Sequence, residues 1–176
     1  ALVAGLTPLK LNAVMLEPYW REDVPALLSR AARWGVELRL IELMEIGSGA
    51  KWTADVRGVT ARTVRAWLAR RMEFEPLRGA PGAAALRGGV LWDGRRVEVG
   101  WITPVSQPFC GRCDRLRVDA AGRLRRCLMD AQTWPLAERL ERGPDPALRA
   151  EVLGYLAGKR PPRGMTAPCT MDLTGG

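Results

Sequence analysis

The chain has 176 residues, of which 47% are apolar, and this is enough to bury a hydrophobic core. Its formal net charge is +8 and its pI is near 10.2, but only three of the 27 basic residues are lysines. The arginines are scattered along the sequence and predict no continuous basic groove, which argues against specific nucleic-acid binding. No apolar run approaches the roughly 20 residues that span a bilayer, and no signal peptide is recognisable. We therefore expect a soluble, cytoplasmic protein that does not bind membranes.

The cysteine content restricts the metal sites that the chain can form. There are four cysteines and no histidine, which excludes Cys₂His₂ zinc and Rieske-type ligation. Cys110, Cys113 and Cys127 lie close together in the sequence, whereas Cys169 stands alone. Without a signal peptide, this distribution favours a metal site over disulfides.

The first 44 residues predict a strand, a helix and a second strand. Residues 9–16 alternate between an apolar face and a face that carries Lys10 and Asn12. Residues 21–34 have apolar side chains at helical spacing, and residues 36–44 form a nearly continuous apolar strand. The succession predicts a βαβ unit with parallel strands. Because the sequence opens directly before a strand, we expect a fragment of a longer protein.

Beyond residue 44 the sequence predicts short elements joined by loops. Thr60 is a suitable N-cap for a helix. The pair Asp93-Gly94, flanked by apolar residues, is typical of a tight β-hairpin. In chain order we expect a Gly-, Ala- and Pro-rich loop over 79–89, the hairpin over 89–102, helices over 135–142 and 146–158, and an irregular tail over 160–176.

The strongest chemical signal is the cysteine region. Cys110 and Cys113 form a Cys-x₂-Cys loop, which lets two thiolates face one metal ion. With Cys127 as a third ligand, two interpretations stay open on spacing alone. One is a structural zinc ion closed by Cys169 or a carboxylate, and the other is a [4Fe–4S] cluster with one open iron.

A hairpin turn would bring these cysteines together. If residues 119–122 form a four-residue loop, Val118 pairs with Arg123, and Cys127 then lies opposite Asp114, beside Cys113. A slip of one residue in this register would still leave the three sulfurs close together.

Two arginines follow the Cys-x₂-Cys loop. Arg115 and Arg117 are two positions apart, so on a strand both side chains leave the same face. Two planar guanidinium groups beside a metal site are suited to binding a polyphosphate. The alternative is a solvated hairpin face, because other arginines lie nearby.

Four motifs then resemble one family. Residues 104–128 are similar to the C-terminal cluster motif of the GTP 3′,8-cyclases, radical S-adenosylmethionine (SAM) enzymes of molybdenum cofactor biosynthesis. Residues 38–47 resemble the family's sixth-strand motif, and Lys10-Leu11-Asn12 resembles its fifth-strand motif. The terminal Gly175-Gly176 is like the family's double-glycine tail. The motifs occur in the family's order and span almost the whole chain.

The resemblance implies an α/β fold in three parts. Residues 1–47 would be the last two strand units of an incomplete (βα)6 TIM-type barrel. Residues 48–165 would be an α+β domain whose β-hairpins hold an iron–sulfur cluster and bind GTP. Residues 166–176 would be a tail that ends in Gly-Gly.

The resemblance also implies the roles of individual residues. Cys110, Cys113 and Cys127 would hold a [4Fe–4S] cluster whose open iron contacts the guanine of GTP. The other implied roles are GTP binding by Lys10, Arg115, Leu116 and Arg117, SAM binding by Met44 and Asn12, and catalytic support by Arg39, Gly175 and Gly176. Because Arg39 and Met44 are five positions apart, both reach one pocket only if the strand ends or bulges between Glu42 and Met44.

The implied reaction is a radical cyclisation. A first [4Fe–4S] cluster cleaves SAM, and the 5′-deoxyadenosyl radical abstracts the ribose 3′ hydrogen of GTP, which leads to 3′,8-cyclo-7,8-dihydro-GTP. The family's Cys-x₃-Cys-x₂-Cys motif for that first cluster does not occur in this sequence. We therefore expect this chain alone to be inactive and to act with a missing N-terminal barrel half. The expected partners are GTP and that half, with a homodimer as one further assembly.

Three other interpretations compete with this one. The first is a basic, non-catalytic zinc-ribbon-like module that uses Cys169 as its fourth ligand. The second is an auxiliary electron-transfer cluster, which would also need a fourth cysteine. The third takes Gly175-Gly176 as a ubiquitin-like conjugation tail, but no compact β-grasp pattern precedes it.

Overall fold

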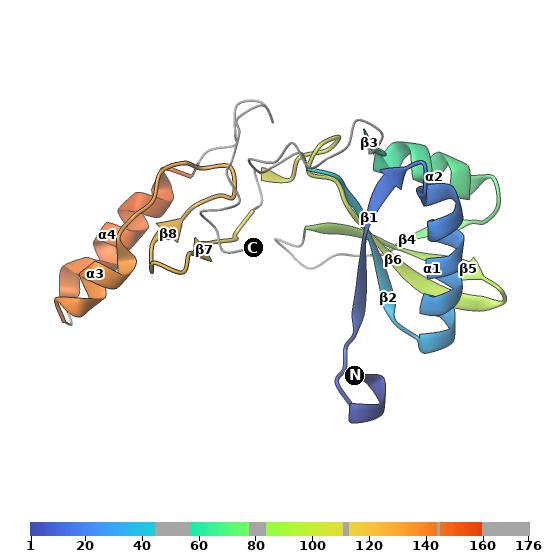
Figure 1. Ribbon diagram of the computed structural model, residues 1–176, viewed down its shortest axis with the longest axis horizontal. Coiled ribbons are helices and arrows are strands. Elements are labelled where there is room, and N and C mark those ends of the chain that lie inside the picture. The colour runs from blue at the N-terminus through green and yellow to red at the C-terminus, as the bar shows by residue number, and fades with distance from the viewer. Residues whose placement is uncertain (45–56, 78–83, 111–112, 144, 160–176) are drawn as a thin grey trace. The chain divides into compact units, whose positions relative to one another are not determined.

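A computed structural model describes residues 1–44, 57–77, 84–110, 113–143 and 145–159 (Figure 1). The described residues fall into two compact units, which divide between Phe109 and Cys110 and are treated separately below. Among the described helices, none has the length and apolar character to cross a membrane. The tail residues Cys169, Gly175 and Gly176 lie outside the described residues.

The first unit begins with the expected βαβ arrangement. After a short 3-10 helix, η1 (Leu2–Ala4), come β1 (Lys10–Glu17), α1 (Trp20–Trp34) and β2 (Glu37–Glu42). Strands β1 and β2 are parallel, which confirms the prediction. Helix α1 ends at Gly35, whose positive φ of 65° suits a glycine at a helix C-terminus.

The same sheet continues through the next four strands in the chain. The elements are β3 (Arg57–Gly58), α2 (Ala61–Ala69), β4 (Phe74–Leu77), β5 (Ala85–Trp92) and β6 (Arg95–Ile102). The strand order is β3-β1-β2-β6-β5-β4, with β6 parallel to β2 and antiparallel to β5. The hairpin between β5 and β6 therefore extends the sheet that the βαβ unit starts.

The hairpin prediction is confirmed, but the predicted loop over 79–89 is wrong from residue 85 onward. Asp93 and Gly94 both have positive φ, as a two-residue type I′ turn requires. Strand β5 starts at Ala85 and includes Gly88, where an added Cβ would lie 1.9 Å from Cζ of Phe74. The glycine that indicated a loop therefore makes room for an aromatic ring from the neighbouring strand.

The hydrophobic core of the first unit lies on one face of its sheet. Both α1 and α2 pack there, and Figure 1 shows the two helices on the same side. Trp20 and Trp101 are among the largest fully buried side chains. Leu11, Ala13 and Met15 of β1 face this core, so Lys10 and Asn12 point to the opposite face, as the alternation predicts.

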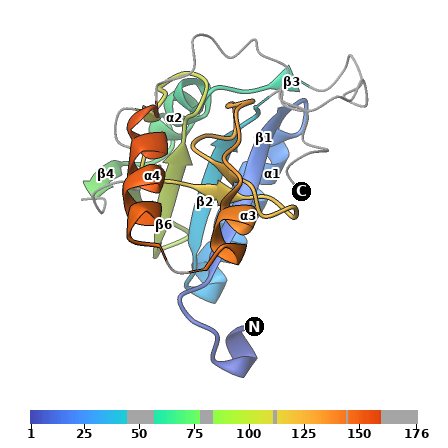
Figure 2. The ribbon, with the colours of Figure 1, turned by 90° about the vertical axis from the view of Figure 1, so that its left-hand side faces the viewer.

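The second unit consists of a small hairpin and two helices (Figure 2). Its elements are β7 (Arg117–Val118), β8 (Leu124–Arg125), α3 (Leu136–Glu141) and α4 (Pro146–Ala157). Both helices were predicted within one or two residues of these bounds. The Tyr155 hydroxyl of α4 lies 3.1 Å from the Leu124 carbonyl oxygen and 3.0 Å from that of Gln132 and shares its one hydrogen between them, which attaches the helix to the hairpin.

The α/β class predicted from the sequence is confirmed by the mixed sheet and its helices. The incomplete (βα)6 barrel concerns a longer protein and stays a prediction. The predicted domain boundary after residue 47 also stays a prediction, because the division at Phe109 reflects compactness and not family membership.

Candidate functional site

The cysteine hairpin closes with a register different from the predicted one. Val118 pairs with Leu124 and Arg117 with Arg125, so by extension Cys127 falls opposite Arg115 and not opposite Asp114. The prediction assumed a four-residue loop, and it was wrong by one position. Such a shift changes which side chains face each other across the two strands.

The side chain of Asp119 explains this register. Its carboxylate accepts hydrogen bonds from the backbone N–H groups of Ala121 (3.0 Å) and Arg123 (2.9 Å). The Asp119 N–H in turn donates to the Arg123 carbonyl at 3.0 Å. Gly122 adopts a φ of 70°, which a three-residue loop needs at this position. Asp119 and Arg123 therefore close the hairpin as a pair.

The three cysteines are free thiols, and each is half-buried. The backbone N–H of Cys113 donates to the Cys110 carbonyl at 3.2 Å, so a turn joins these two residues. The Met129 N–H points at Sγ of Cys127 at 3.4 Å. Lys159, just beyond α4, donates from Nζ to Sγ of Cys113 at 3.4 Å and to the Arg115 carbonyl at 2.7 Å.

These contacts favour a thiolate at Cys113. Burial raises the pKa of the Cys113 thiol, but the Arg115 backbone hydrogen bond and the Lys159 ammonium group together hold that pKa below its ordinary value. Donors to sulfur and a nearby positive charge suit a thiolate ligand. The chemistry of the donor set therefore fits a soft, thiolate-bound metal group.

The ligand geometry is not preformed, however. Within residues 113–143 and the other described ranges, no three Cys, Asp or Glu side chains are arranged to hold a metal ion. The folded hairpin therefore does not by itself assemble the expected group of three sulfurs. Cluster ligation by Cys110, Cys113 and Cys127 stays a prediction.

The arginines predicted to bind phosphate lie at the start of this hairpin. Arg115, Leu116 and Arg117 are exposed. Arg117 pairs across the strands with Arg125, whose side chain is buried and donates to the Asp130 carbonyl at 3.1 Å. Two guanidinium-bearing residues thus face each other across the ladder.

In the first unit, β1 and β2 bring three of the predicted site residues together. Lys10 lies opposite Glu37, and Asn12 lies opposite Arg39. The Arg39 Nε donates to Oε1 of Glu37 at 2.9 Å, and Glu37 is otherwise buried. Lys10, Asn12 and Arg39 therefore share one polar patch on the sheet face opposite the core.

Strand β2 ends at Glu42, before Met44. This agrees with the geometric condition under which Arg39 and Met44 can reach the same pocket. Met44 is the last described residue before the gap at 45–56, and its side chain is half-buried.

Glu42 is a site residue that the sequence reasoning missed. Its carboxylate is 2% exposed and accepts hydrogen bonds from four groups on two other segments. The donors are the N–H groups of Ala61, Val105 and Ser106, at 2.8, 3.1 and 2.8 Å, and the hydroxyl of Ser106. The available signal was a charged residue directly after the apolar pair Leu40-Ile41.

Glu42 therefore fixes the end of β2 to its surroundings. It holds the first turn of α2 and the 103–107 segment that leads to the cysteine hairpin. Burial raises the pKa of Glu42, but its hydrogen bonds from Ser106, Ala61 and Val105 outweigh this, so the pKa lies below the ordinary value. The group is an ionised structural carboxylate.

The chain thus combines a mixed-sheet α/β unit with a hairpin that carries three free thiols, and this makes it a candidate metal-binding protein. Comparison with known families identifies it more closely. Residues 36–165 match the family described as Molybdenum Cofactor Synthesis C, and the chain belongs to this family.

Curated relatives carry the name GTP 3′,8-cyclase. The one from Pelotomaculum thermopropionicum is 36% identical over 143 residues, which cover 81% of this chain and 44% of that protein. The one from Corynebacterium glutamicum (strain R) is 33% identical over 175 residues, covering 94% of this chain and 45% of that protein. The one from Synechococcus sp. (strain CC9605) is 38% identical over 144 residues, covering 80% and 41%. The chain therefore spans less than half the length of these relatives.

Proposed function

We propose that this chain is the C-terminal half of a GTP 3′,8-cyclase and binds GTP next to a [4Fe–4S] cluster. The observation that carries the proposal is the family match over a segment that contains the three free thiols of Cys110, Cys113 and Cys127. The names of the relatives support the same reaction. In the whole enzyme, the role would be radical SAM cyclisation of GTP in molybdenum cofactor biosynthesis.

Cys110, Cys113 and Cys127 would be the three protein ligands of the cluster. When bound, the cluster would supply an open iron that acts as a Lewis acid toward the guanine base. The N–H of Met129 and the ammonium group of Lys159 would then donate hydrogen bonds to two ligand sulfurs, as they do to the free thiols. Such donors tune the electron density on a cluster's sulfurs.

The exposed stretch from Arg115 to Arg117 would hold the nucleotide. Two guanidinium groups only two positions apart in the sequence, with Arg117 in β7 and Arg115 before it, can bind a triphosphate through bidentate hydrogen bonds. Leu116 lies between them with an exposed side chain and would contact the rest of the nucleotide.

The polar patch on β1 and β2 would supply the remaining contacts of the reaction. Lys10 would contact GTP, and Arg39 would support catalysis from its position beside Asn12. Asn12 and Met44 would contact SAM. Glu37 accepts a hydrogen bond from Nε of Arg39, and this contact orients the Arg39 side chain.

The other parts of the reaction would come from elsewhere. The SAM-cleaving cluster would belong to the first half of the barrel, since its cysteine motif does not occur in this sequence. Gly175 and Gly176 would enter the active site and support catalysis. This chain alone would bind cluster and nucleotide without turning over.

GTP binding by the reconstituted chain tests the proposal. The cluster is rebuilt anaerobically with iron and sulfide, its retention is checked by absorbance, and GTP affinity is measured by calorimetry. Arg117→Gln should weaken GTP binding about 10- to 100-fold, from a charge-assisted contact of roughly 1.5–3 kcal/mol. Arg30→Gln on α1 is the matched control and should bind like the parent chain. Equal affinity for GTP in the Arg117→Gln and parent chains would reject the phosphate role.

A further inference from the structure

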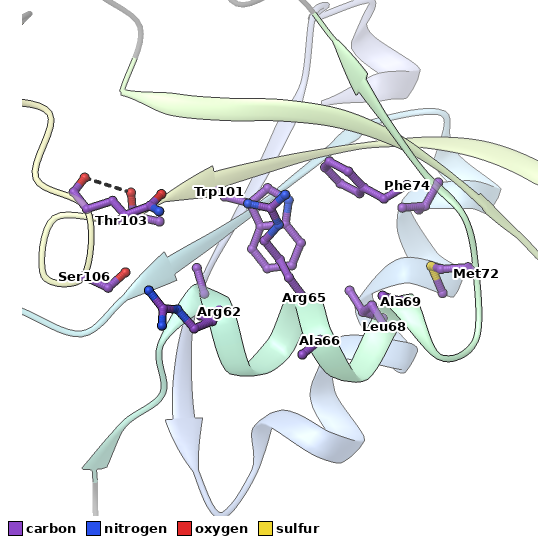
Figure 3. A pocket seen from close by; sticks show the side chains of 13 residues that line it. Arg62, Arg65, Ala66, Leu68, Ala69, Met72, Phe74, Trp101, Thr103 and Ser106 are labelled. Carbon is purple, nitrogen blue, oxygen red and sulfur yellow. Dashed lines mark hydrogen bonds between the residues drawn. The ribbon is translucent and has the colours of Figure 1, made fainter.

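A cavity of about 400 Å³ opens on the core side of the first unit's sheet. It lies between α2, the strands β4 to β6, and the 103–107 segment, as Figure 3 shows from close by. Its size falls within the range typical of small-molecule sites. Trp101 of β6 lines it from the core face, so the cavity lies on the face opposite Lys10 and Asn12.

One end of the cavity is aromatic. The rings of Phe74 and Trp101 meet edge to face with centroids 6.2 Å apart. Phe74 owes its position to Gly88, since a side chain there would collide with the ring. Met72 lies beside Phe74 and completes the apolar wall. The wall is thus built from three segments that pack together.

The other end of the cavity is polar and positively charged. Arg62 and Arg65 project from the same side of α2 (Figure 3). Thr103 and Ser106, on the 103–107 segment, line the cavity opposite them. Arg65 lies over both aromatic rings, 5.1 Å from the Phe74 centroid and 5.9 Å from that of Trp101. Among the lining residues that the structure describes, none is acidic. Within the described residues, neither guanidinium pairs with a carboxylate.

We propose that this cavity is a second binding site, for a planar aromatic anion such as an aromatic carboxylate. The flat ring packs against Phe74 and Trp101, and the anionic group pairs with Arg62 and Arg65. This site is separate from the proposed GTP-binding residues, because those of the first unit lie on the other face of the sheet.

Calorimetric titration of the full chain with 2-naphthoate tests the proposal. The neutral isostere 2-naphthamide should bind about tenfold more weakly, because it lacks the charge that pairs with the guanidinium groups. Arg65→Gln and Arg62→Gln should each weaken 2-naphthoate binding about tenfold as well.

Arg30→Gln is the matched control, since Arg30 is an exposed arginine of α1 that does not line the cavity. Circular dichroism verifies that each variant is folded. The proposal is overturned if 2-naphthoate shows no saturable binding below about 1 mM, a free energy near −4 kcal/mol. It is equally overturned if naphthoate and naphthamide bind alike, or if Arg30→Gln loses as much affinity as Arg65→Gln.

Discussion

Replacement of Glu42 by glutamine should destabilise the first unit. Each oxygen of the carboxylate accepts hydrogen bonds from two donors. The Ala61 N–H and the Ser106 hydroxyl donate to Oε1, and the N–H groups of Val105 and Ser106 donate to Oε2. A glutamine amide has one accepting oxygen, so its NH₂ group must face one of these donor pairs.

The size of the destabilisation depends on which of the two donor pairs the NH₂ group faces. If the NH₂ group faces the Oε1 side, the Ser106 hydroxyl can rotate and become an acceptor, whereas the Ala61 N–H is left without a partner. One unsatisfied buried N–H costs about 1–3 kcal/mol, and the loss of the charge adds to this. We expect a decrease of about 2 kcal/mol in the free energy of unfolding, or about 4–8 °C in Tm.

Urea denaturation followed by circular dichroism measures this change. Glu73→Gln, at an exposed position before β4, is the matched control and should change the free energy by less than about 0.5 kcal/mol. A Glu42→Gln chain as stable as the control would refute the reasoning.

The same pair of chains gives a pH dependence with a defined sign. Because hydrogen bonds hold the pKa of folded Glu42 below its ordinary value, its stabilising effect is fully present above the unfolded pKa, about 4.3 for glutamate. That effect is lost as the pH falls through the folded pKa. The difference in stability between parent and Glu42→Gln should therefore shrink at acid pH, and a constant difference would contradict the assignment.

Two further predictions concern the cysteine hairpin. Lys159→Met removes the ammonium group next to Cys113, so the pKa of that thiol should rise and its alkylation by iodoacetamide near neutral pH should slow, as followed by peptide mass spectrometry. Lys10→Met is the control, and an unchanged Cys113 rate in Lys159→Met would contradict the contact. Gly122→Ala should cost about 1–3 kcal/mol in urea denaturation, because φ is 70° and the new Cβ would lie 2.4 Å from Cβ of Ala137. Ala120→Gly, in the same loop, serves for comparison, and a Gly122→Ala chain no less stable than it would show that the loop is not constrained.

Local patterns in the sequence predicted much of the fold. The alternation in β1, the helical spacing in α1 and the Asp93-Gly94 turn each reflect a short-range rule, and each was confirmed. The start of β5 was missed because Gly88 is required by Phe74, a residue on a different strand. Contacts between strands do not show in local composition.

In the candidate site, too, the features that the sequence did not predict depend on contacts between residues far apart or on side chains within a turn. The hairpin register depends on the Asp119 carboxylate, which turns an assumed four-residue loop into a three-residue one. The role of Glu42 depends on partners 63 and 64 positions away in the chain. The adjacency of Lys10, Asn12 and Arg39 needed the register of β1 and β2, although the resemblance had already singled out all three residues.

The central claim is that three thiols of one hairpin hold an iron–sulfur cluster. Iron and acid-labile sulfide analysis of the anaerobically reconstituted chain tests it most directly, with Cys127→Ala and Cys169→Ala beside the parent. We expect about four irons and four sulfides per chain in the parent and in Cys169→Ala, and a large loss of both iron and sulfide in Cys127→Ala. Zinc in place of iron in the protein as purified, or loss of the cluster in Cys169→Ala, would contradict it.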